Sequence, residues 1–361
     1  DVPGHDNSAM DGYAVRSADL PAEGECRLRL IGSALAGAPW DRALEPGQCL
    51  RIMTGAVMPP GADSVIMQER AERDGVQIRI GSGHRVGENV RRAGEDIARG
   101  ASVLPAGRRL RPADLGLLAS LGLAEVRVRR RLRVAFFSTG DELRSIGQPL
   151  GPGDVYDSNR YTLHGMLSRL GVELLDLGVV RDRREALRQA FTDAAAIADV
   201  VITSGGVSVG EADYVKAILA ELGEIGFWKI AMKPGRPLAF GRLGEAAFFG
   251  LPGNPVAVMV TFYQFVQPAL RRLAGEPDAP PQRFRVPCLS ALKKRPGRSE
   301  FQRGILALRA DGSLAVSLTG KQGSGILSSM SRANCFIVLD PASEGIQPGD
   351  LVQVEPFEGL V

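Results

Sequence analysis

A glycine-rich stretch with polar side chains, TSGGVSVGEAD at 203–213, has the residue types most suited to chemistry in this chain. It follows a short apolar run and precedes a helical pattern. A glycine-rich turn between a buried strand and a helix presents backbone N–H groups to an anion. Ser208, Glu211 and Asp213 add a hydroxyl and two carboxylates, so the turn suits an oxyanion that is handled together with a metal ion or a proton.

The same turn also has a simpler interpretation. Gly205 and Gly206 form a common turn sequence, the Ser208 hydroxyl is able to bond its own backbone, and Asp213 is suited to cap a helix. The glycine spacing is like the start of a P-loop, but Glu211 stands where that motif requires lysine, which excludes a P-loop. The rest of the chain must decide between the two interpretations.

The composition is that of a soluble globular protein with a large core. Of the 361 residues, 44% are hydrophobic and 24% are charged. This length allows two to four domains at roughly 100–200 residues each. The formal net charge of +3 is too small to indicate nucleic-acid binding, but it favours an anionic substrate. The arginines at 127–133 alternate with apolar residues, which favours a strand or linker with a solvated face.

The cysteines and histidines indicate neither a disulfide framework nor a zinc site. The four cysteines are far apart and form no C-x-x-C pair, as expected for reduced core residues of a cytoplasmic protein. None of the three histidines lies near a cysteine or another histidine. No run of about 18 apolar residues is present, so we expect no membrane-spanning helix. Because the sequence begins at Asp1 inside a motif-like stretch, we expect residues ahead of it.

Strand and helix patterns alternate in the centre of the chain. The patterns predict strands at 133–137, 172–180 and 199–203, and helices that begin near Ser158 and at Asp182. This alternation indicates a doubly wound parallel sheet with helices on both faces. Ligands of such sheets bind beyond the carboxyl ends of the strands. Glu142, Asp182 and the 203–213 turn all follow strands, so we expect them to converge on one edge.

The flanking regions have other patterns. Residues 1 to about 130 are rich in turns and strands, with one helical pattern at 112–121. Strands at 237–242 and 246–251 predict a hairpin. Beyond a proline-rich linker at 276–281, short strands and turns indicate a small barrel or sandwich.

The segment LPGNP at 251–255 leads into an apolar helix that extends to about Leu273. Asn254 is expected as the N-cap and Pro255 as the first helical residue. The segment has two equally supported interpretations, a helix N-terminus placed for an anion and a rigid turn.

Seven segments of the chain are unusual enough to identify a family. They lie at 6–15, 51–56, 94–97, 140–143, 203–213, 233–237 and 251–255. In this order they resemble the motifs of the MoeA family of molybdopterin molybdenumtransferases, which includes the E-domain of gephyrin. The resemblance runs from Asp1 to Val361 and lacks only an N-terminal part.

The resemblance implies four domains in each subunit of a homodimer. The implied domains are an extended β/α linking domain (1–7 and 102–131), a β-rich domain (8–101), a molybdopterin-binding α/β domain (132–278) and a C-terminal β-barrel (279–361). The resemblance also implies an active site between subunits. Asp11, Thr54 and Asp96 of one chain would face the α/β edge of the other.

The reaction implied by the resemblance is insertion of molybdate into adenylylated molybdopterin, with Mg²⁺ and with release of AMP. Lys233, Arg236 and Ser208 would hold the molybdate dianion. The other implied substrate-binding residues are Thr54, Gly205, Gly206, Pro252, Asn254 and Pro255. Glu142, Asp182 and Asp213 would bind Mg²⁺ or relay protons, and Asp11 and Asp96 complete the catalytic candidates. Asp213 is the first candidate for an essential role.

Several of these residues have structural alternatives. Asp182 begins an Asp-x-x-Glu pattern that is typical of a helix cap, and Asp96 is also suited to shape a turn. The sequence departs from the family at two positions. Arg236 stands where lysine is frequent, and Ala257 stands where many members have serine, which removes one hydroxyl from the oxyanion site.

Two other functions share part of this pattern. A related stand-alone α/β domain adenylylates molybdopterin, but the large β-rich regions on both sides argue against that step. A gephyrin-like scaffold uses a fused adenylylating domain and a long linker, which these 361 residues lack. The implied partners are a molybdopterin-adenylylating enzyme and the molybdoenzymes that accept the cofactor. No nucleic-acid or membrane partner is expected.

Overall fold

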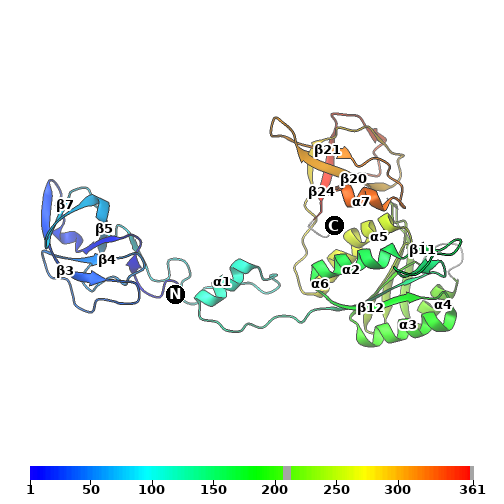
Figure 1. Ribbon diagram of the computed structural model, residues 1–361, viewed down its shortest axis with the longest axis horizontal. Helices are drawn as coiled ribbons and strands as arrows, with labels where there is room; N and C mark the ends of the chain where they lie inside the picture. The colour runs from blue at the N-terminus through cyan, green and yellow to red at the C-terminus, as the bar shows by residue number, and fades with distance from the viewer. Residues whose placement is uncertain (206–212, 358–361) are drawn as a thin grey trace. The chain divides into compact units, whose positions relative to one another are not determined.

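The computed structural model describes residues 1–205 and 213–357 (Figure 1). They form two compact units, Asp1–Arg127 and Val128–Val361. Within 1–205 and 213–357, no helix combines the length and apolar character needed to cross a membrane.

The first unit is built on a six-stranded sheet. Its strand order is β5 (Ser64–Met67), β2 (Gly12–Val15), β4 (Gln48–Ile52), β3 (Glu25–Ala34), β7 (Gln77–Gly81) and β6 (Ala71–Asp74). Successive side chains of a strand point to opposite faces, so Tyr13 and Val15 belong to one apolar cluster and Ala14 to another. A short ladder joins β1 (Asn7–Ser8) to β8 (Val90–Arg91), and the predicted helix is α1 (Pro112–Ser120).

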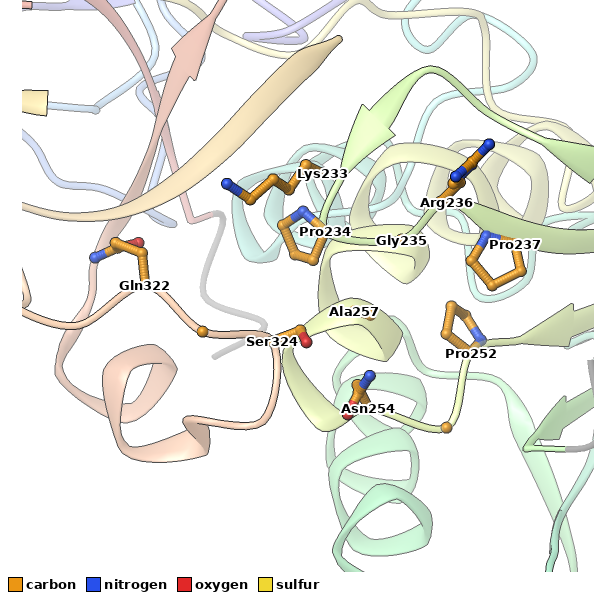
Figure 2. A pocket seen from close by; sticks show the side chains of 12 residues that line it. Lys233, Pro234, Gly235, Arg236, Pro237, Pro252, Asn254, Ala257, Gln322 and Ser324 are labelled. Atoms are coloured by element: carbon orange, nitrogen blue, oxygen red, sulfur yellow. The ribbon is translucent and has the colours of Figure 1, made fainter. Parts of the chain in front are cut away.

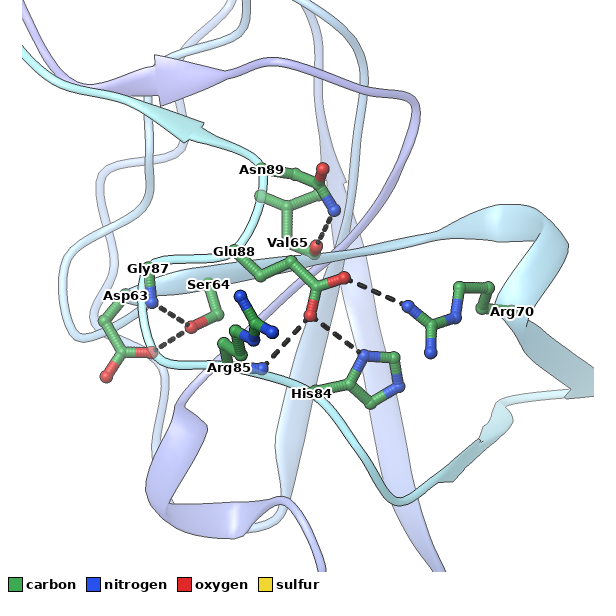
Figure 3. Close-up of polar contacts among 9 residues, drawn as sticks. All are labelled: Asp63, Ser64, Val65, Arg70, His84, Arg85, Gly87, Glu88 and Asn89. Atoms are coloured by element: carbon green, nitrogen blue, oxygen red, sulfur yellow. Dashed lines mark hydrogen bonds and ion pairs between the residues drawn. The ribbon is translucent and has the colours of Figure 1, made fainter.

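A polar network holds the loop before β8 against β5 (Figure 3). The Glu88 carboxylate accepts hydrogen bonds from the Arg85 N–H at 3.1 Å and from Arg70 at 3.1 Å, and it lies 3.2 Å from the His84 ring. The Asn89 amide donates to the Val65 carbonyl at 2.9 Å. Because these bonds join separate segments, the loop has a defined position.

The second unit contains a six-stranded α/β sheet with strand order β12-β9-β13-β17-β16-β14. The bounds are β9 (Arg133–Thr139), β12 (Glu173–Val180), β13 (Val200–Ser204), β14 (Gly223–Lys229), β16 (Pro237–Leu243) and β17 (Ala246–Leu251). Strands β12, β9, β13 and β17 are parallel, which confirms the doubly wound class, and β16 and β14 extend the sheet in antiparallel pairing. The predicted hairpin is β16–β17.

Helices cover both faces of this sheet (Figure 1). They are α2 (Ser158–Leu170), α3 (Arg184–Ile197), α4 (Asp213–Leu222), α5 (Pro255–Thr261), a π-helical turn (Phe262–Val266) and α6 (Gln267–Leu273). Two neighbouring residues of β9 point to opposite faces of the sheet. Phe136 packs in a cluster with Leu163 of α2, whereas Phe137 packs against Phe191 of α3 at 5.3 Å between ring centroids.

The C-terminal strands of the second unit form the expected barrel. They are β18 (Phe284–Pro287), β20 (Ser299–Leu308), β21 (Leu314–Leu318), β22 (Cys335–Leu339) and β24 (Leu351–Pro356). They pair in the order β18-β24-β22-β20-β21. A bridge between Cys288 and Val316 then joins the two ends of that order and closes the ring. The short helix α7 (Leu327–Arg332) contacts β20.

One short strand from the α/β region enters the barrel sheet. Strand β15 (Met232–Lys233) precedes β16 in the chain, yet it pairs in parallel with β20, which places Lys233 opposite Glu300. The 233–237 segment therefore lies where the α/β sheet and the barrel meet.

Candidate functional site

The loops after four parallel strands lie together at one edge of the α/β sheet. Ser204 at the end of β13 is in register with Ser138 of β9 and with Leu251 of β17, and Thr139 is in register with Val180 of β12. The loops that leave these strands contain Glu142, Asp182, Gly205 and Pro252. The predicted convergence on one edge is thus confirmed for the described residues.

Gly205 allows the ends of β9 and β13 to approach closely. Its φ is +89°, a conformation that favours glycine, and a Cβ atom there would lie 2.4 Å from the Thr139 carbonyl oxygen. Its N–H donates to the Leu251 carbonyl at 3.2 Å. Gly206 and Ser208 lie outside the described residues, as does the side chain of Asp213, the first residue of α4.

Asp182 is not the cap that its sequence pattern suggests. Helix α3 begins at Arg184, and its N-cap position is Arg183, which makes no side-chain capping bond. Asp182 lies one residue earlier, and its carboxylate accepts a long hydrogen bond from the Thr139 hydroxyl at 3.4 Å. The exposed carboxylate therefore belongs to the edge of the sheet rather than to the helix.

Glu142 supplies a second exposed carboxylate at this edge. It folds back over Gly140, where an added Cβ would lie 2.7 Å from a Glu142 carboxylate oxygen. Among the residues that the structure describes, no three Asp, Glu, His or Cys side chains group as a metal site. The predicted metal set of Glu142, Asp182 and Asp213 includes a side chain outside that description, so it stays a prediction.

Asn159, in the first turn of α2, links two of these loops. Its amide nitrogen donates to the Ser204 hydroxyl at 2.8 Å and to the Gly253 carbonyl at 2.7 Å. The sequence pattern does not single out this residue, because one asparagine near a helix start has no distinctive signal. Its contacts hold the ends of β13 and β17 in fixed relation.

A cavity of about 330 Å³ lies beside the edge, between the 233–237 segment, the start of α5 and a loop before α7 (Figure 2). Its lining includes the predicted binding residues Lys233, Arg236, Pro252 and Asn254. Pro255 follows directly in the chain and begins α5, as predicted. The cavity thus gathers residues from three separate segments.

The start of α5 forms one wall of the cavity. Ala257, which departs from the family pattern, is buried there and lines the cavity with a methyl group in place of a hydroxyl. Asn254 occupies the N-cap position of α5, as predicted, but its side chain makes no capping bond. The exposed Asn254 amide is therefore available to a ligand in the cavity.

Two cations extend from opposite ends of the 233–237 segment (Figure 2). The Lys233 ammonium forms an ion pair with Glu300 at 3.3 Å, and its side chain is 52% exposed while that of Glu300 is 5% exposed. Arg236 is exposed and forms no ion pair with any described residue. Since an ammonium has three donors and a guanidinium has five, both side chains keep donors for an anion.

The third wall of the cavity, formed by the loop before α7, is bonded to Arg303 through the Gly323 carbonyl. The sequence pattern does not single out Arg303 either. Arg303 is 1% exposed, and its guanidinium donates to the Ser329 hydroxyl and to the Gly323 carbonyl, each at 3.0 Å. No described carboxylate pairs with it. Burial lowers the pKa of Arg303 to about 10, so it remains a cation at neutral pH. It places positive charge behind the Gly323 and Ser324 wall.

Asp11 and Thr54 lie together in the first unit. One Asp11 carboxylate oxygen accepts from the Thr54 N–H at 2.8 Å and from its hydroxyl at 2.7 Å. These bonds, the backbone bond first, lower the pKa of Asp11. Asp96 is exposed, and the turn around it is bonded by Glu95, whose carboxylate accepts from the Arg92 N–H at 2.9 Å.

A doubly wound α/β sheet, with a cavity lined by Lys233 and Arg236 at its edge and a barrel beside it, defines a multidomain α/β protein. Three family models match in succession: the MoeA N-terminal region (domain I and II) at 1–122, a probable molybdopterin binding domain at 135–272, and the MoeA C-terminal region (domain IV) at 285–357.

Curated relatives agree with these matches. A molybdopterin molybdenumtransferase of Haemophilus influenzae is 46% identical over 100% of this chain and 89% of its own length. One from Nostoc is 40% identical over 98% of this chain and 83% of its own. Two crystal structures of a molybdopterin biosynthesis MoeA protein from Pyrococcus horikoshii, 33% and 28% identical, have TM-scores of 0.81 and 0.84 and cover 99% of this chain and 89% of theirs. The chain belongs to the MoeA family of molybdopterin molybdenumtransferases, a family of transferases.

Proposed function

We propose that this chain inserts molybdate into adenylylated molybdopterin, with Mg²⁺, and releases AMP and the molybdenum cofactor. The proposal is supported by the family and by one observation above all, the cavity where Lys233 and Arg236 meet the edge of the α/β sheet. A tetrahedral oxyanion fills only part of about 330 Å³, so the remaining space accommodates part of the organic substrate.

In this proposal the cavity residues bind and orient the oxyanion. Lys233 acts as a point charge held in place by Glu300, and Arg236 donates two parallel N–H groups to one face of the anion. The buried charge of Arg303 strengthens the attraction without contacting solvent, because charges act more strongly in a poorly hydrated interior. Asn254 contributes a neutral donor from the opposite wall.

The carboxylates at the edge of the sheet have a different task. Two Mo–S bonds form as oxo groups of molybdate leave as water, each taking two protons from the substrate thiols or from the site, and a water molecule cleaves the phosphoanhydride to release AMP. Glu142 and Asp182 are exposed at the edge, where they are able to pass protons between solvent and the bound anion. We assign Asp213 to the same task from its position at the start of α4.

Magnesium fits the chemistry of this edge. Carboxylate oxygens are its preferred protein ligands, and Glu142 and Asp182 are both exposed there. When bound, the ion supplies positive charge that offsets the charge of the phosphoanhydride. Thr139 and Gly205 shape the surface on which the phosphate groups of the substrate would lie.

We further propose that the protein works as a cytoplasmic homodimer, with Asp11, Thr54 and Asp96 of one subunit completing the site of the other. The support is the exposure of two leucines in and just after α1: Leu115 is 58% exposed and Leu123 is 50% exposed. In the proposed dimer these apolar side chains would be covered by the partner subunit. A molybdopterin-adenylylating enzyme would supply the substrate, and molybdoenzymes would accept the product.

Single-turnover AMP release tests the reaction. Protein, adenylylated molybdopterin, Mg²⁺ and molybdate are mixed, and wild type is compared with Asp213→Ala and with Arg285→Gln, an exposed cation on β18, as the control. We expect molybdate-dependent AMP release that Asp213→Ala abolishes and Arg285→Gln retains. If the wild type binds the adenylate but never releases AMP with molybdate present, the proposed reaction is wrong.

A further inference from the structure

A second cavity, of about 520 Å³, lies next to the first and shares Lys233 with it. Its other cations are Lys293, Lys294, Arg295 and Arg298, all from the chain that leads into β20. None of these four belongs to the site described above. The two cavities are therefore neighbours, and the Lys233 side chain lines both of them.

The second cavity has a marked excess of positive charge. Its five cations face two carboxylates, Glu300 and Glu344. The buried Glu300 carboxylate is already engaged, since it accepts from Lys233 at 3.3 Å and from the Gln302 amide at 3.1 Å. Glu344 is exposed and forms no ion pair with a described residue. The charge excess is therefore not balanced within the cavity.

Three of the cations are directed to solvent rather than to protein acids. Lys293, Arg295 and Arg298 are exposed, and within 1–205 and 213–357 none of them forms an ion pair. By contrast, Arg283 of the same barrel pairs with Glu355 at 2.7 Å. Clustering three unpaired cations costs free energy through mutual repulsion, which a bound anion would relieve.

The lining of the cavity also includes a buried lysine, Lys294. Lys294 is 7% exposed, and it donates to the carbonyls of Pro341 at 3.1 Å and Ser343 at 3.0 Å, with a longer contact of 3.4 Å to Arg295. Its hydrogen bonds are satisfied, but no described carboxylate neutralises its charge. Because Lys294 is little exposed to water, its charge is weakly screened and attracts an anion in the cavity strongly.

Local folding fixes these cations in place. Strands β19 (Leu292–Lys293) and β23 (Gly345–Ile346) form their own antiparallel ladder, which sets Lys293 opposite Gly345. The φ of Gly345 is +136°, and a Cβ there would lie 2.9 Å from the Leu292 carbonyl oxygen, so the ladder requires glycine. Backbone pairing therefore fixes the position of this part of the cavity lining.

We propose that this second cavity is an anion-capture site, which takes a tetrahedral oxyanion from solvent and passes it to the first cavity across Lys233. The identity of the anion as molybdate rests on the proposed function. Among the described residues, no aromatic side chain lines the cavity to stack on a nucleobase, which favours a small inorganic anion over a nucleotide. A cleft lined by one sign of charge raises the local concentration of its ligand and its association rate.

A matched pair of triple variants tests the capture site. Lys293→Gln, Arg295→Gln and Arg298→Gln remove the exposed cations but leave Lys233 and Lys294. Arg285→Gln, Arg309→Gln and Arg332→Gln remove the same charge from other exposed positions of the barrel. The readouts are the KM for molybdate and kcat of AMP release, at low and at high salt, and molybdate binding by equilibrium dialysis without the organic substrate.

We expect the first triple variant to raise the KM for molybdate about tenfold at low salt, with kcat unchanged and with the difference shrinking at high salt. Dialysis should show weaker molybdate binding than in the control variant. Equal KM, salt dependence and dialysis curves for both variants would overturn the inference. If the wild type releases no AMP, the proposed reaction fails, while the dialysis result still decides whether the cavity captures molybdate.

Discussion

The edge of the α/β sheet and the cavity beside it differ in charge. The edge presents the exposed carboxylates of Glu142 and Asp182, whereas the cavity presents Lys233 and Arg236 with Arg303 behind its wall. Among the described residues, Lys233 forms its ion pair with Glu300 of the barrel and not with a carboxylate of the edge. This difference fits the two roles that we propose: the cavity holds an anion, and the edge moves protons or binds a cation.

The largest expected effect is on the cavity. Lys233→Met should lower kcat/KM for molybdate by about 10³-fold, because it removes the charged donor that we propose holds the anion. It also leaves the Glu300 carboxylate without its cation, so a thermal melt must show that the variant is folded. Lys233→Arg, which keeps the charge, should recover much of the loss. Equal losses of kcat/KM in both variants would show that the positive charge at position 233 does not determine the reaction with molybdate.

Substitutions at the edge of the sheet should lower kcat and leave the affinity for molybdate nearly unchanged. Asp182→Asn keeps the size of the side chain but removes its proton-accepting oxygen, so kcat for AMP release should fall by about 10²-fold. The KM for molybdate should change little if, as we propose, the oxyanion binds in the cavity. A variant that raises this KM as much as Lys233→Met does would remove the distinction between edge and cavity.

Asn159 links the edge to the cavity, because its amide bonds the loop after β13 and the loop after β17. Asn159→Ala should lower kcat by about tenfold, as expected for misplaced reacting groups. Asn159→Asp keeps the side-chain size but loses the amide donor, so it should show a similar decrease. Wild-type kcat in both variants would mean that the two loops hold their positions without it.

A smaller effect is expected at the wall of the cavity. Ala257→Ser restores the hydroxyl that many family members have, and the side chain is positioned to line the cavity. One added neutral hydrogen bond contributes about 1 kcal/mol, so the KM for molybdate should fall by up to about fivefold. An unchanged KM, measured at constant salt, would place the oxyanion away from this wall.

The smallest effect concerns a carboxylate at the opposite end of the sheet. Asp199 accepts two hydrogen bonds from Arg130 at 2.6 Å, and this pairing, stronger than the opposing effect of burial, lowers the pKa of Asp199. A lowered carboxyl pKa contributes stability above the ordinary value of 3.8 and loses it as the pH falls through the folded-state pKa.

Urea unfolding of Asp199→Asn and wild type should therefore differ by at most about 1 kcal/mol at pH 7, because the pair is partly exposed. The difference should shrink towards pH 3. A difference that is constant from pH 7 to pH 3 would show that the charge of Asp199 contributes nothing.

The features that rest on periodicity and chain order could be predicted from the sequence. The strands at 133–137 and 199–203 have apolar patterns that match buried strands, and parallel strands bring their carboxyl ends to one edge. These two rules are sufficient to place Glu142, Asp182 and Gly205 together. Motif resemblance added Lys233 and Arg236, which share no periodic signal with the strands.

Predictions from local sequence patterns failed where tertiary contacts determine the position of a side chain. The Asp-x-x-Glu pattern at Asp182 suggested a cap, but the chain turns one residue later, so Arg183 occupies the N-cap position. Arg303 lies in a strand where a charged residue is expected to face solvent, yet it is buried because Ser329 and Gly323 accept its donors. No pattern within the strand could indicate partners that are 26 and 20 residues away.

The pairing of β15 with β20 has a consequence for how this protein could be divided. Lys233 reaches its place through a strand that belongs to the barrel sheet, although the chain on both sides of it belongs to the α/β sheet. An α/β fragment cut before β18 would retain the lysine but lose both its strand partner and its carboxylate. The cavity that we propose for the oxyanion therefore needs both parts of the chain, and fragments that separate the α/β sheet from the barrel should keep a fold but lose the proposed activity.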